Sequence, residues 1–411
     1  MTILENEPIE RQSSDAPVQA PDTARTVVPV RPPAHTAPQE RRPIGKVSRR
    51  DVMALVGALV SAVSTTMLLF GRLTPLSGKF GFTVVAFVLF ILTYTVLVSF
   101  TDNRPAVVDR VMTALLAASA ISAFFALFSV IIFVLVKGWS ALTKPNFYVH
   151  DMSVTGPQEP LTSGGILHAI VGTLIMTAIA LVITVPLGVA CSVFLNESKG
   201  RMAMLVRTVV TAMTALPSIL AGLFIFATWI LILGFERSGL AAAIAMSIMM
   251  LPIIIRSADV VLRLVPGSLR EASAALGAPQ WRTVWHVVLP TARSGLTTAV
   301  ILGVARGVGE TAPILLTAGF TSTMNVDPLH NPMVSLPLAA YEMVRSPQPT
   351  MIARGFGTAA VLMVLVLVLF TLARIVGGRP AGRLSKRQSR RAERQSIDDL
   401  RRIEQNGTVP S

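Results

Sequence analysis

The sequence has a single cysteine, Cys191, and only five histidines among its 411 residues. One cysteine excludes an intramolecular disulfide framework. The histidines are scattered without the spacing that metal ligands show, so no metal site is predicted.

Charge is scarce as well. Charged residues make up 14% of the chain and apolar residues 52%, whereas soluble domains carry about 25% charged residues. This composition predicts an all-α polytopic membrane protein. The net charge of +14 comes from basic residues in the tails and in short loops beside apolar segments. That distribution is typical of the positive-inside rule, so nucleic acid is not expected as a partner.

Eight apolar segments are interpreted as membrane spans, most of them near the roughly 20 residues that a bilayer core requires. They are residues 52–70, 80–100, 111–136, 166–195, 208–234, 240–255, 295–317 and 355–376. Three of them contain a proline that predicts a kink: Pro186, Pro217 and Pro313. Residues 196–207 are predicted to form a short polar loop. Eight crossings place both termini on one side, and clustered arginines assign that side to the cytoplasm.

The two ends of the chain are polar. Residues 1–50 are rich in Pro, Ser, Thr, Gln and Arg without an apolar period, which predicts a disordered cytoplasmic tail. Residues 377–411 form a basic cytoplasmic tail. Within the outer loop 321–349, the run SLPLAAYEMV predicts a short helix.

The polar loop 256–290 has the local chemistry of two short helices. Ser268 precedes Glu271 by three residues, which predicts a capping box at the start of a helix over 269–276. Gly277 follows as a residue able to adopt the left-handed conformation. Pro279 then suits the first position of a second helix. Trp281, Val284, Trp285 and Val288 would share one face of that helix.

The same loop carries a spaced motif. Glu271-Ala272-Ser273, Gly277, Val287 and Leu289-Pro290 follow the pattern EAA, three residues, G, nine residues, I, one residue, LP. This resembles the EAA loop of ABC importer membrane subunits, with Ser273 and Val287 in place of the usual Ala and Ile. The segments LPSILAGLF, LPIIIRSADVVLRLVPGSLREA and VARGVGETAPILLTAG extend the resemblance to the permease subunits of phosphate importers, over roughly residues 111–374.

The resemblance implies a type I ABC importer permease core of six transmembrane helices, residues 111–376, preceded by two extra transmembrane helices, residues 51–110. It implies that loop 256–290 couples the permease to an ATP-binding subunit through Glu271, Ala272, Gly277, Leu289 and Pro290. It further implies a second, related permease subunit, a dimer of ATP-binding subunits and an extracytoplasmic phosphate-binding protein as partners, besides membrane lipid. ATP and Mg²⁺ would bind the ATPase, and this chain would need no cofactor.

Two charged residues lie inside the seventh predicted span. Arg306 and Glu310 are four residues apart, hence on one helix face. An arginine near the bilayer centre costs about 2.5–3.5 kcal/mol, so it should face the bundle interior or a wet cavity. Residue chemistry leaves two hypotheses open, a structural ion pair and a charge in the substrate pathway. The resemblance favours the second, because it implicates this arginine in phosphate passage.

Arg256 ends the sixth predicted span. Alone it is an ordinary topology anchor, but the resemblance aligns PIIIR with a basic residue tied to phosphate transport, so Arg256 joins the candidate pathway. Arginine suits an oxyanion because its planar fork donates paired hydrogen bonds.

The chain has no GxxxxGK[ST] phosphate loop, so it is not expected to hydrolyse ATP. The sequence therefore predicts the permease subunit of an ATP-driven phosphate importer, a transporter and not an enzyme. Two alternatives remain. One is an ABC permease for another oxyanion, such as sulfate or molybdate. The other is a secondary transporter or channel in which Arg306 and Glu310 form a relay.

Overall fold

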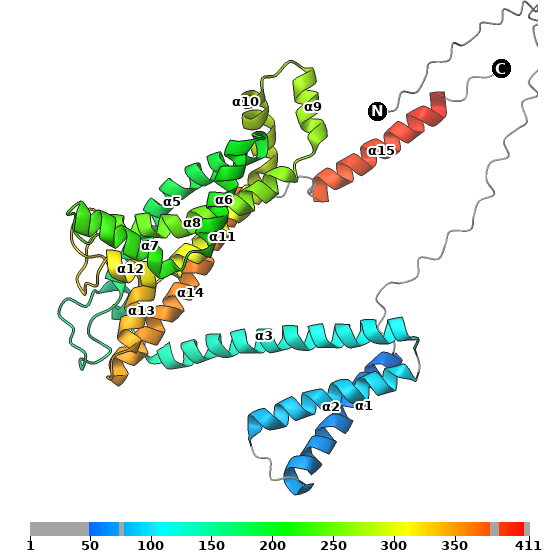
Figure 1. The fold of residues 1–411 in the computed structure, drawn as a ribbon, viewed down its shortest axis with the longest axis horizontal. Helices are drawn as coiled ribbons and strands as arrows, with labels where there is room; N and C mark the ends of the chain where they lie inside the picture. Colours follow the sequence, from blue (N-terminus) through cyan, green and yellow to red (C-terminus); the bar gives the residue numbers. More distant parts are fainter. Residues whose placement is uncertain (1–48, 74–77, 101, 379–385, 407–411) are drawn as a thin grey trace, which may run out of the picture. The chain divides into compact units, whose positions relative to one another are not determined.

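A computed structural model describes residues 49–73, 78–100, 102–378 and 386–406, and every element within these ranges is helical. The chain divides into two compact units, Met1–Ser119 and Ala120–Ser411. Figure 1 shows the course of the chain. Within the described residues, seven helices are long and apolar enough to cross a membrane, or eight if one bent pair of helices counts as a single span.

The first unit contains the two predicted N-terminal spans. They appear as α1 (Arg49–Leu68), which continues into a π-helical turn η1 (Leu69–Leu73), and α2 (Lys79–Ser99). Ala58, Tyr94 and Val98 form a small core where these helices pack against the start of α3 (Arg104–Leu142). Arg110 pairs with Asp51 and, at 3.0 Å, with Asp102. The predicted tail over residues 1–50 lies outside the described residues except for its last two.

The second unit is built around two helices that run in the same direction, α5 (Leu167–Glu197) and α8 (Gly239–Arg263). Their first turns meet at Met333, which lies against both Gly172 and Gly239, and further along Gly188 faces Ile254. Because α5 and α8 are parallel, the segment between them has to return to the end where α5 began.

That return segment corrects one prediction. Residues 196–207 are not all loop, since α6 (Arg201–Ala215) begins at Arg201. It is followed by α7 (Ser218–Ile225) and a π-helical stretch η2 (Phe226–Ile232). The chain bends by 103° between α6 and α7, where Pro217 precedes the first residue of α7. Proline is tolerated at this position because the first N–H groups of a helix have no intrahelical acceptor.

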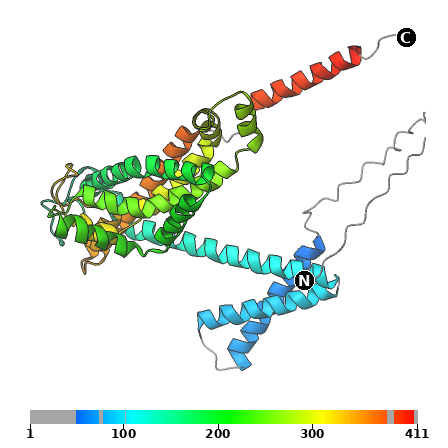
Figure 2. The same ribbon diagram turned by 45° about the horizontal axis from the view of Figure 1, so that its top comes forward.

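A polar connection joins α8 to the next span through α9 (Gly267–Ala275), α10 (Gln280–Thr283) and the π-helical stretch η3 (Val284–Val288). Helix α11 (Leu289–Val308) then runs antiparallel to α8: Gly295 faces Val261, Gly303 faces Ile254 and Gly307 faces Met250. Figure 2 shows α9 and α10 projecting beyond the ends of α8 and α11.

Two further span predictions need correction. Helix α8 does not end at Ile255 but continues to Arg263. The predicted span 295–317 is two helices, because α11 ends at Val308 and α12 (Ala312–Thr317) starts after a short break. Pro313 therefore lies in the first turn of α12, where its missing N–H removes no helical hydrogen bond. Pro186, by contrast, lies inside α5, which continues through it as one helix.

The remaining elements close the second unit. α4 (Asn146–Val149) and α13 (Leu336–Val344) lie in the two long loops, and α13 confirms the short helix predicted there. α14 (Pro349–Gly377) is the last apolar helix, and its end meets α11, where Arg293 donates to the Val376 carbonyl at 2.9 Å. α15 (Lys386–Asn406) is a polar helix within the predicted C-terminal tail.

Candidate functional site

Helix α9 carries the EAA residues and has a well-defined end. Gly277 has φ 77°, in the left-handed region predicted for it. Gly277 N donates to the Ala274 carbonyl at 2.9 Å and Ala278 N to the Ser273 carbonyl at 3.2 Å. These two bonds form a Schellman motif, which fixes the direction in which the chain leaves the helix.

The start of α9 differs from the prediction. The helix begins at Gly267, after Pro266, so Ser268 lies inside the helix and does not cap it. No side-chain capping bond forms at this end, and the predicted capping box is wrong. The physical reason is that Pro266 already supplies an extended residue before the helix, two positions earlier than Ser268 would.

The second helix of the loop also differs from its prediction. Helix α10, η3 and α11 follow one another without a break from Gln280, so the segment after Pro279 is the beginning of a long helix and not a separate short one. Trp281 and Trp285 are exposed, whereas Val288 is buried. Leu289 and Pro290 open α11.

Together α9 and α10 form an exposed tip. Ser273 Oγ and Thr283 Oγ1 lie 2.8 Å apart and join the two helices. A groove of about 510 Å³ beside them is lined by Ser273, Ala278, Trp281, Arg282, His286 and Val287. Leu276 at the end of α9 is 89% exposed. Glu271 and Ala272 are exposed as well. Exposed leucine and tryptophan side chains on a polar protrusion are typical of a protein-binding surface.

A polar network holds this tip to the rest of the bundle. Glu197, the last residue of α5, forms an ion pair with Arg270 of α9 and accepts a hydrogen bond from Gln280 Nε2 at 3.1 Å. Arg270 also donates to Asn196 Oδ1 at 2.9 Å. Sequence reasoning missed Glu197 and Asn196, since a lone Asn-Glu pair in a loop carries no spacing signal.

A second carboxylate lies near the same end of the bundle. Asp259 of α8 accepts from Arg263 at 2.7 Å and lies 3.5 Å from Arg207 of α6. This carboxylate explains why α6 and α8 extend beyond their apolar segments, because each extension places an arginine beside it. Asp259 was also missed by sequence reasoning.

The predicted pair Arg306 and Glu310 does form. Arg306 Nε lies 2.9 Å from Glu310 Oε1, with the arginine side chain 55% exposed and the glutamate side chain 12% exposed. Arg306 belongs to the last turn of α11, and Glu310 lies in the break before α12. Among the described residues, the Arg306 Nη atoms have no hydrogen-bond partner. The planar end of the guanidinium is therefore free for a ligand.

Arg256 is not brought to this pair. Because Gly307 faces Met250, Arg306 lies level with the middle of α8. Arg256 is then displaced by about five residues along α8, or roughly 7 Å. Its side chain is exposed, and α8 continues for two further turns beyond it. Arg256 thus lies inside a helix and not at its end, contrary to the prediction.

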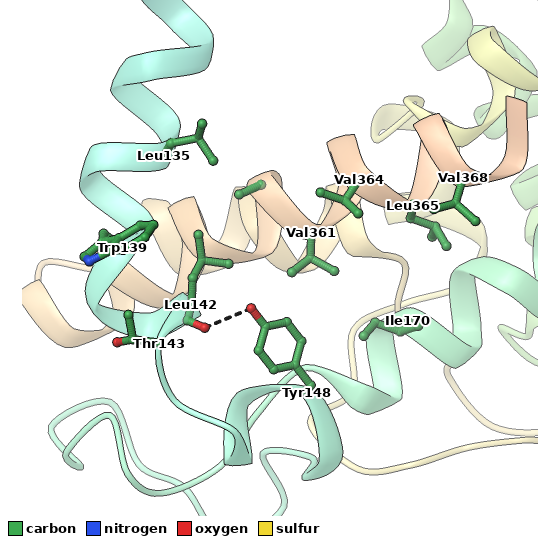
Figure 3. Close-up of a pocket in the computed structure, with 11 residues that line it drawn as sticks. Leu135, Trp139, Leu142, Thr143, Tyr148, Ile170, Val361, Val364, Leu365 and Val368 are labelled. Atoms are coloured by element: carbon green, nitrogen blue, oxygen red, sulfur yellow. Dashed lines mark hydrogen bonds between the residues drawn. The ribbon is translucent and has the colours of Figure 1, made fainter. Parts of the chain in front are cut away.

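One well-formed groove of about 560 Å³ lies elsewhere, between α3, α4, α5 and α14 (Figure 3). Figure 3 shows Leu142, Val361 and Val364 among its lining side chains, and the Tyr148 hydroxyl donates to the Leu142 carbonyl at 2.9 Å. None of the described residues that line it is charged. The groove is therefore a largely apolar feature, separate from the Arg306–Glu310 pair.

A buried arginine orders the opposite end of the bundle. Arg354 of α14 is 1% exposed, and its Nη2 donates to the carbonyls of Pro160 at 2.8 Å and Ser163 at 2.9 Å. These bonds fix the loop before α5. Near the same loop Asp151 accepts from Met324 N at 3.1 Å and so joins the two long loops. The Ser153 hydroxyl donates to Asp151 and lowers the pKa of that carboxyl.

The described residues contain no group of three or more His, Cys, Asp or Glu side chains that could hold a metal ion. The site consists instead of a half-exposed arginine–glutamate pair within the helical bundle and a helical tip at one end of it.

Comparison with known proteins agrees with this description. Residues 184–380 match the family of binding-protein-dependent transport system inner membrane components. The chain is 36% identical over 274 residues to the phosphate transport system permease protein PstA 1 of Mycobacterium tuberculosis (strain H37Rv), covering 66% of this chain and 88% of that protein. It is 38% identical over 234 residues to the PstA of Mycobacterium leprae, covering 57% and 76%.

A solved structure is similar in fold: a chain of the MetNI methionine ABC transporter in an inward-facing conformation, with a TM-score of 0.39 and 20% identity, covering 52% of this chain and 91% of that chain. The relatives are permease proteins, so the prediction of a transporter subunit and not an enzyme is confirmed, as is the all-α ABC permease fold class. From its identity to them over most of their length, the chain belongs to the PstA family of phosphate transport system permease proteins.

Proposed function

We propose that this chain forms part of the translocation pathway of an ATP-driven inorganic phosphate importer, and that the α9–α10 tip couples it to an ATP-binding subunit. The observation that carries the proposal is that the EAA residues lie on an exposed tip, within the part of the chain that matches the transport family. Glu271 and Ala272 are on α9 and Gly277 follows its end, with Leu276, Trp281 and Trp285 exposed beside them. A soluble ATPase would bind these side chains.

The membrane topology follows from the helix directions. The bent unit α6–α7–η2 returns between two parallel helices, so it is assigned as one crossing despite its 103° bend. Counted with the seven long helices, it gives eight crossings, six in the core 111–376 and two in residues 51–110. An even number puts both ends of the chain on one side, and we assign that side, which carries the α9–α10 tip, to the cytoplasm because arginines cluster there.

The partners are those of an importer of this architecture. They are a second, related permease subunit, a dimer of ATP-binding subunits that holds ATP and Mg²⁺, and an extracytoplasmic phosphate-binding protein. The permease itself needs no cofactor. Copurification of the ATPase with the chain, followed by phosphate-stimulated ATP hydrolysis in proteoliposomes, tests the assignment. Competition by sulfate and molybdate in the same assay tests the alternative oxyanions. Phosphate uptake without any ATPase would instead show a secondary transporter or channel.

Arg306 is the residue we assign to phosphate. Glu310 holds its Nε and leaves both Nη atoms available, so one oxyanion can accept paired hydrogen bonds from the fork. Binding has to be transient, since a tightly held phosphate would not leave the pathway. Arg256, about 7 Å further along α8 by helical rise, is a second cationic position toward the cytoplasm.

Variants of the pair distinguish a pathway role from a structural one. Arg306→Lys keeps the charge but loses the fork, and Arg306→Gln keeps two amide donors but loses the charge. In the pathway role, Gln abolishes uptake and Lys retains a fraction, with both proteins assembled. In the structural role, Gln leaves Glu310 unpaired. That costs less than the roughly 3–5 kcal/mol of a fully buried pair, because Arg306 is half exposed, and the double variant Arg306→Gln with Glu310→Gln restores assembly and transport. Recovered uptake in the double variant would contradict the pathway role.

A further inference from the structure

Among the described residues of α5, Glu197 forms side-chain hydrogen bonds with both helices of the tip. It is the last residue of α5. Its Oε1 accepts from Arg270 Nη1 of α9, and its Oε2 accepts from Gln280 Nε2 of α10. Each carboxylate oxygen thus binds a different helix. A carboxylate supplies two equivalent acceptors here, whereas an amide would supply one acceptor and no charge to pair with Arg270.

Arg270 makes this attachment firm. Besides Glu197 it donates to Asn196 Oδ1 at 2.9 Å and lies 3.5 Å from the Leu262 carbonyl of α8. The guanidinium of this α9 residue therefore bridges the C-terminal ends of α5 and α8. Its side chain is 25% exposed and that of Glu197 is 18% exposed, so the pair is shielded from much of the solvent that weakens surface ion pairs.

The chain itself already connects the tip to two helices. The residues before α9 continue from α8, and α10 continues through η3 into α11. Helix α5 has no such connection, because Glu197 at its end and Arg270 of α9 are 73 residues apart along the chain. A displacement of the tip therefore reaches α8 and α11 through the backbone, but reaches the end of α5 through Glu197.

Helix α5 is suited to carry that displacement onward. Its 31 residues span roughly 46 Å at 1.5 Å per residue. It packs along α8, where Gly188 faces Ile254, and its first turns lie against Met333 and Val334 in the loop before α13. Thr173 Oγ1 of α5 also accepts from Leu336 N at 2.8 Å. A shift of the Glu197 end is thus applied to a helix that reaches the opposite face of the bundle.

We propose that Glu197 is a positioning residue that transmits movement of the α9–α10 tip to α5, so that three helices and not two respond to the ATPase. The proposal rests on the proposed coupling function of the tip. It assigns no contact between Glu197 and phosphate or ATP. The role acts through Arg270 and Gln280, which the carboxylate holds at a fixed distance from the end of α5.

A charge swap tests this role in the complete importer, reconstituted with its partner permease, ATPase dimer and phosphate-binding protein. Glu197→Arg sets two arginines against each other, whereas Glu197→Arg combined with Arg270→Glu restores the pair in reverse. Gln280 can turn its amide to accept, and Asn196 can turn its amide to donate. Glu342→Gln is the control, because Glu342 and Arg345 form an ion pair within one turn of chain, at 3.8 Å.

The measured quantity is inorganic phosphate taken up per ATP hydrolysed, with copurification of the ATPase as the measure of assembly. Coupling free energies between sites commonly correspond to about 5- to 150-fold effects. We expect Glu197→Arg to lower uptake per ATP by roughly tenfold with the ATPase still bound, the swap to restore most of it, and Glu342→Gln to leave it unchanged.

Unchanged uptake per ATP in Glu197→Arg would overturn the proposal, and so would a swap that stays as uncoupled as the single variant. If Glu197→Arg fails to assemble, Glu197→Ala, which removes both acceptors, replaces it, and an assembled Ala variant with the wild-type ratio overturns the proposal equally. Failure of the proposed function looks different, because the unmodified complex would then show no phosphate-stimulated hydrolysis.

Discussion

Replacing Gly277 by valine is expected to uncouple the permease without preventing its insertion. Gly277 has φ 77°, a conformation that costs an L-residue about 1–2 kcal/mol and a β-branched residue more. A Cβ at this position would have no heavy atom within 4 Å, so the variant introduces backbone strain and no steric clash. If the backbone relaxes instead, the two hydrogen bonds of the Schellman motif are lost, at about 0.5–1.5 kcal/mol each. In the second case α10 leaves α9 in a different direction, and this is the outcome expected for a β-branched residue.

Two control variants separate this effect from the addition of a side chain. Gly277→Asn retains activity because asparagine tolerates the left-handed region. Gly267→Val adds the same valine at the start of α9, where φ is not positive and the nearest heavy atom to the new Cβ is Glu271 Oε1 at 4.0 Å. The assay is phosphate-stimulated ATP hydrolysis in proteoliposomes. Wild-type stimulation in Gly277→Val would refute the reasoning, and so would equal loss in Gly267→Val.

Two further predictions concern the opposite end of the bundle. Arg354→Met leaves the carbonyls of Pro160 and Ser163 without their donor and should lower the unfolding free energy by at least about 2 kcal/mol, measured by thermal unfolding in detergent. The exposed Arg345 serves as control, and an equal effect of Arg345→Met would contradict the assignment. For Asp151, the folded-state pKa is below the ordinary 3.8, so its contribution to stability is complete above that pH and is lost as pH falls through the folded-state pKa. Because this group is partly exposed, the loss should be about 0.2–1 kcal/mol, and Asp151→Asn should remove the pH dependence; an unchanged slope would contradict it.

The sequence predicted the helical elements well because a membrane span needs a long apolar run, and such runs are visible without tertiary information. It misplaced their ends where polar residues continue a helix. Arg201 to Arg207 looked like loop, and α8 looked complete at Ile255. Both extensions depend on Asp259, whose partners Arg207 and Arg263 become neighbours only in the folded chain.

The candidate site shows the same division. The residues of α9 were found because their spacing is local, and the Arg306–Glu310 pair because its members are four residues apart. The hydrogen bonds of Arg354 join groups separated by 191 to 195 residues, and the ion pair of Glu197 with Arg270 joins groups separated by 73. No periodicity or motif encodes such distances, and each side chain alone has the composition of an ordinary loop or helix end.

The glycine contacts between α8 and α11 constrain how the bundle can move. A Cβ at Gly303 would lie 2.5 Å from Ile254 Cγ1, and Gly307 leaves equally little room for Met250. Sliding one helix along the other would drive these side chains into α11 residues that do have a Cβ. The two helices can therefore tilt about their line of contact but cannot slide along each other. Bending is then concentrated at the break between Val308 and Ala312. Arg306 lies before the start of this break and Glu310 lies within it. The distance between their side chains therefore changes with the angle between α11 and α12.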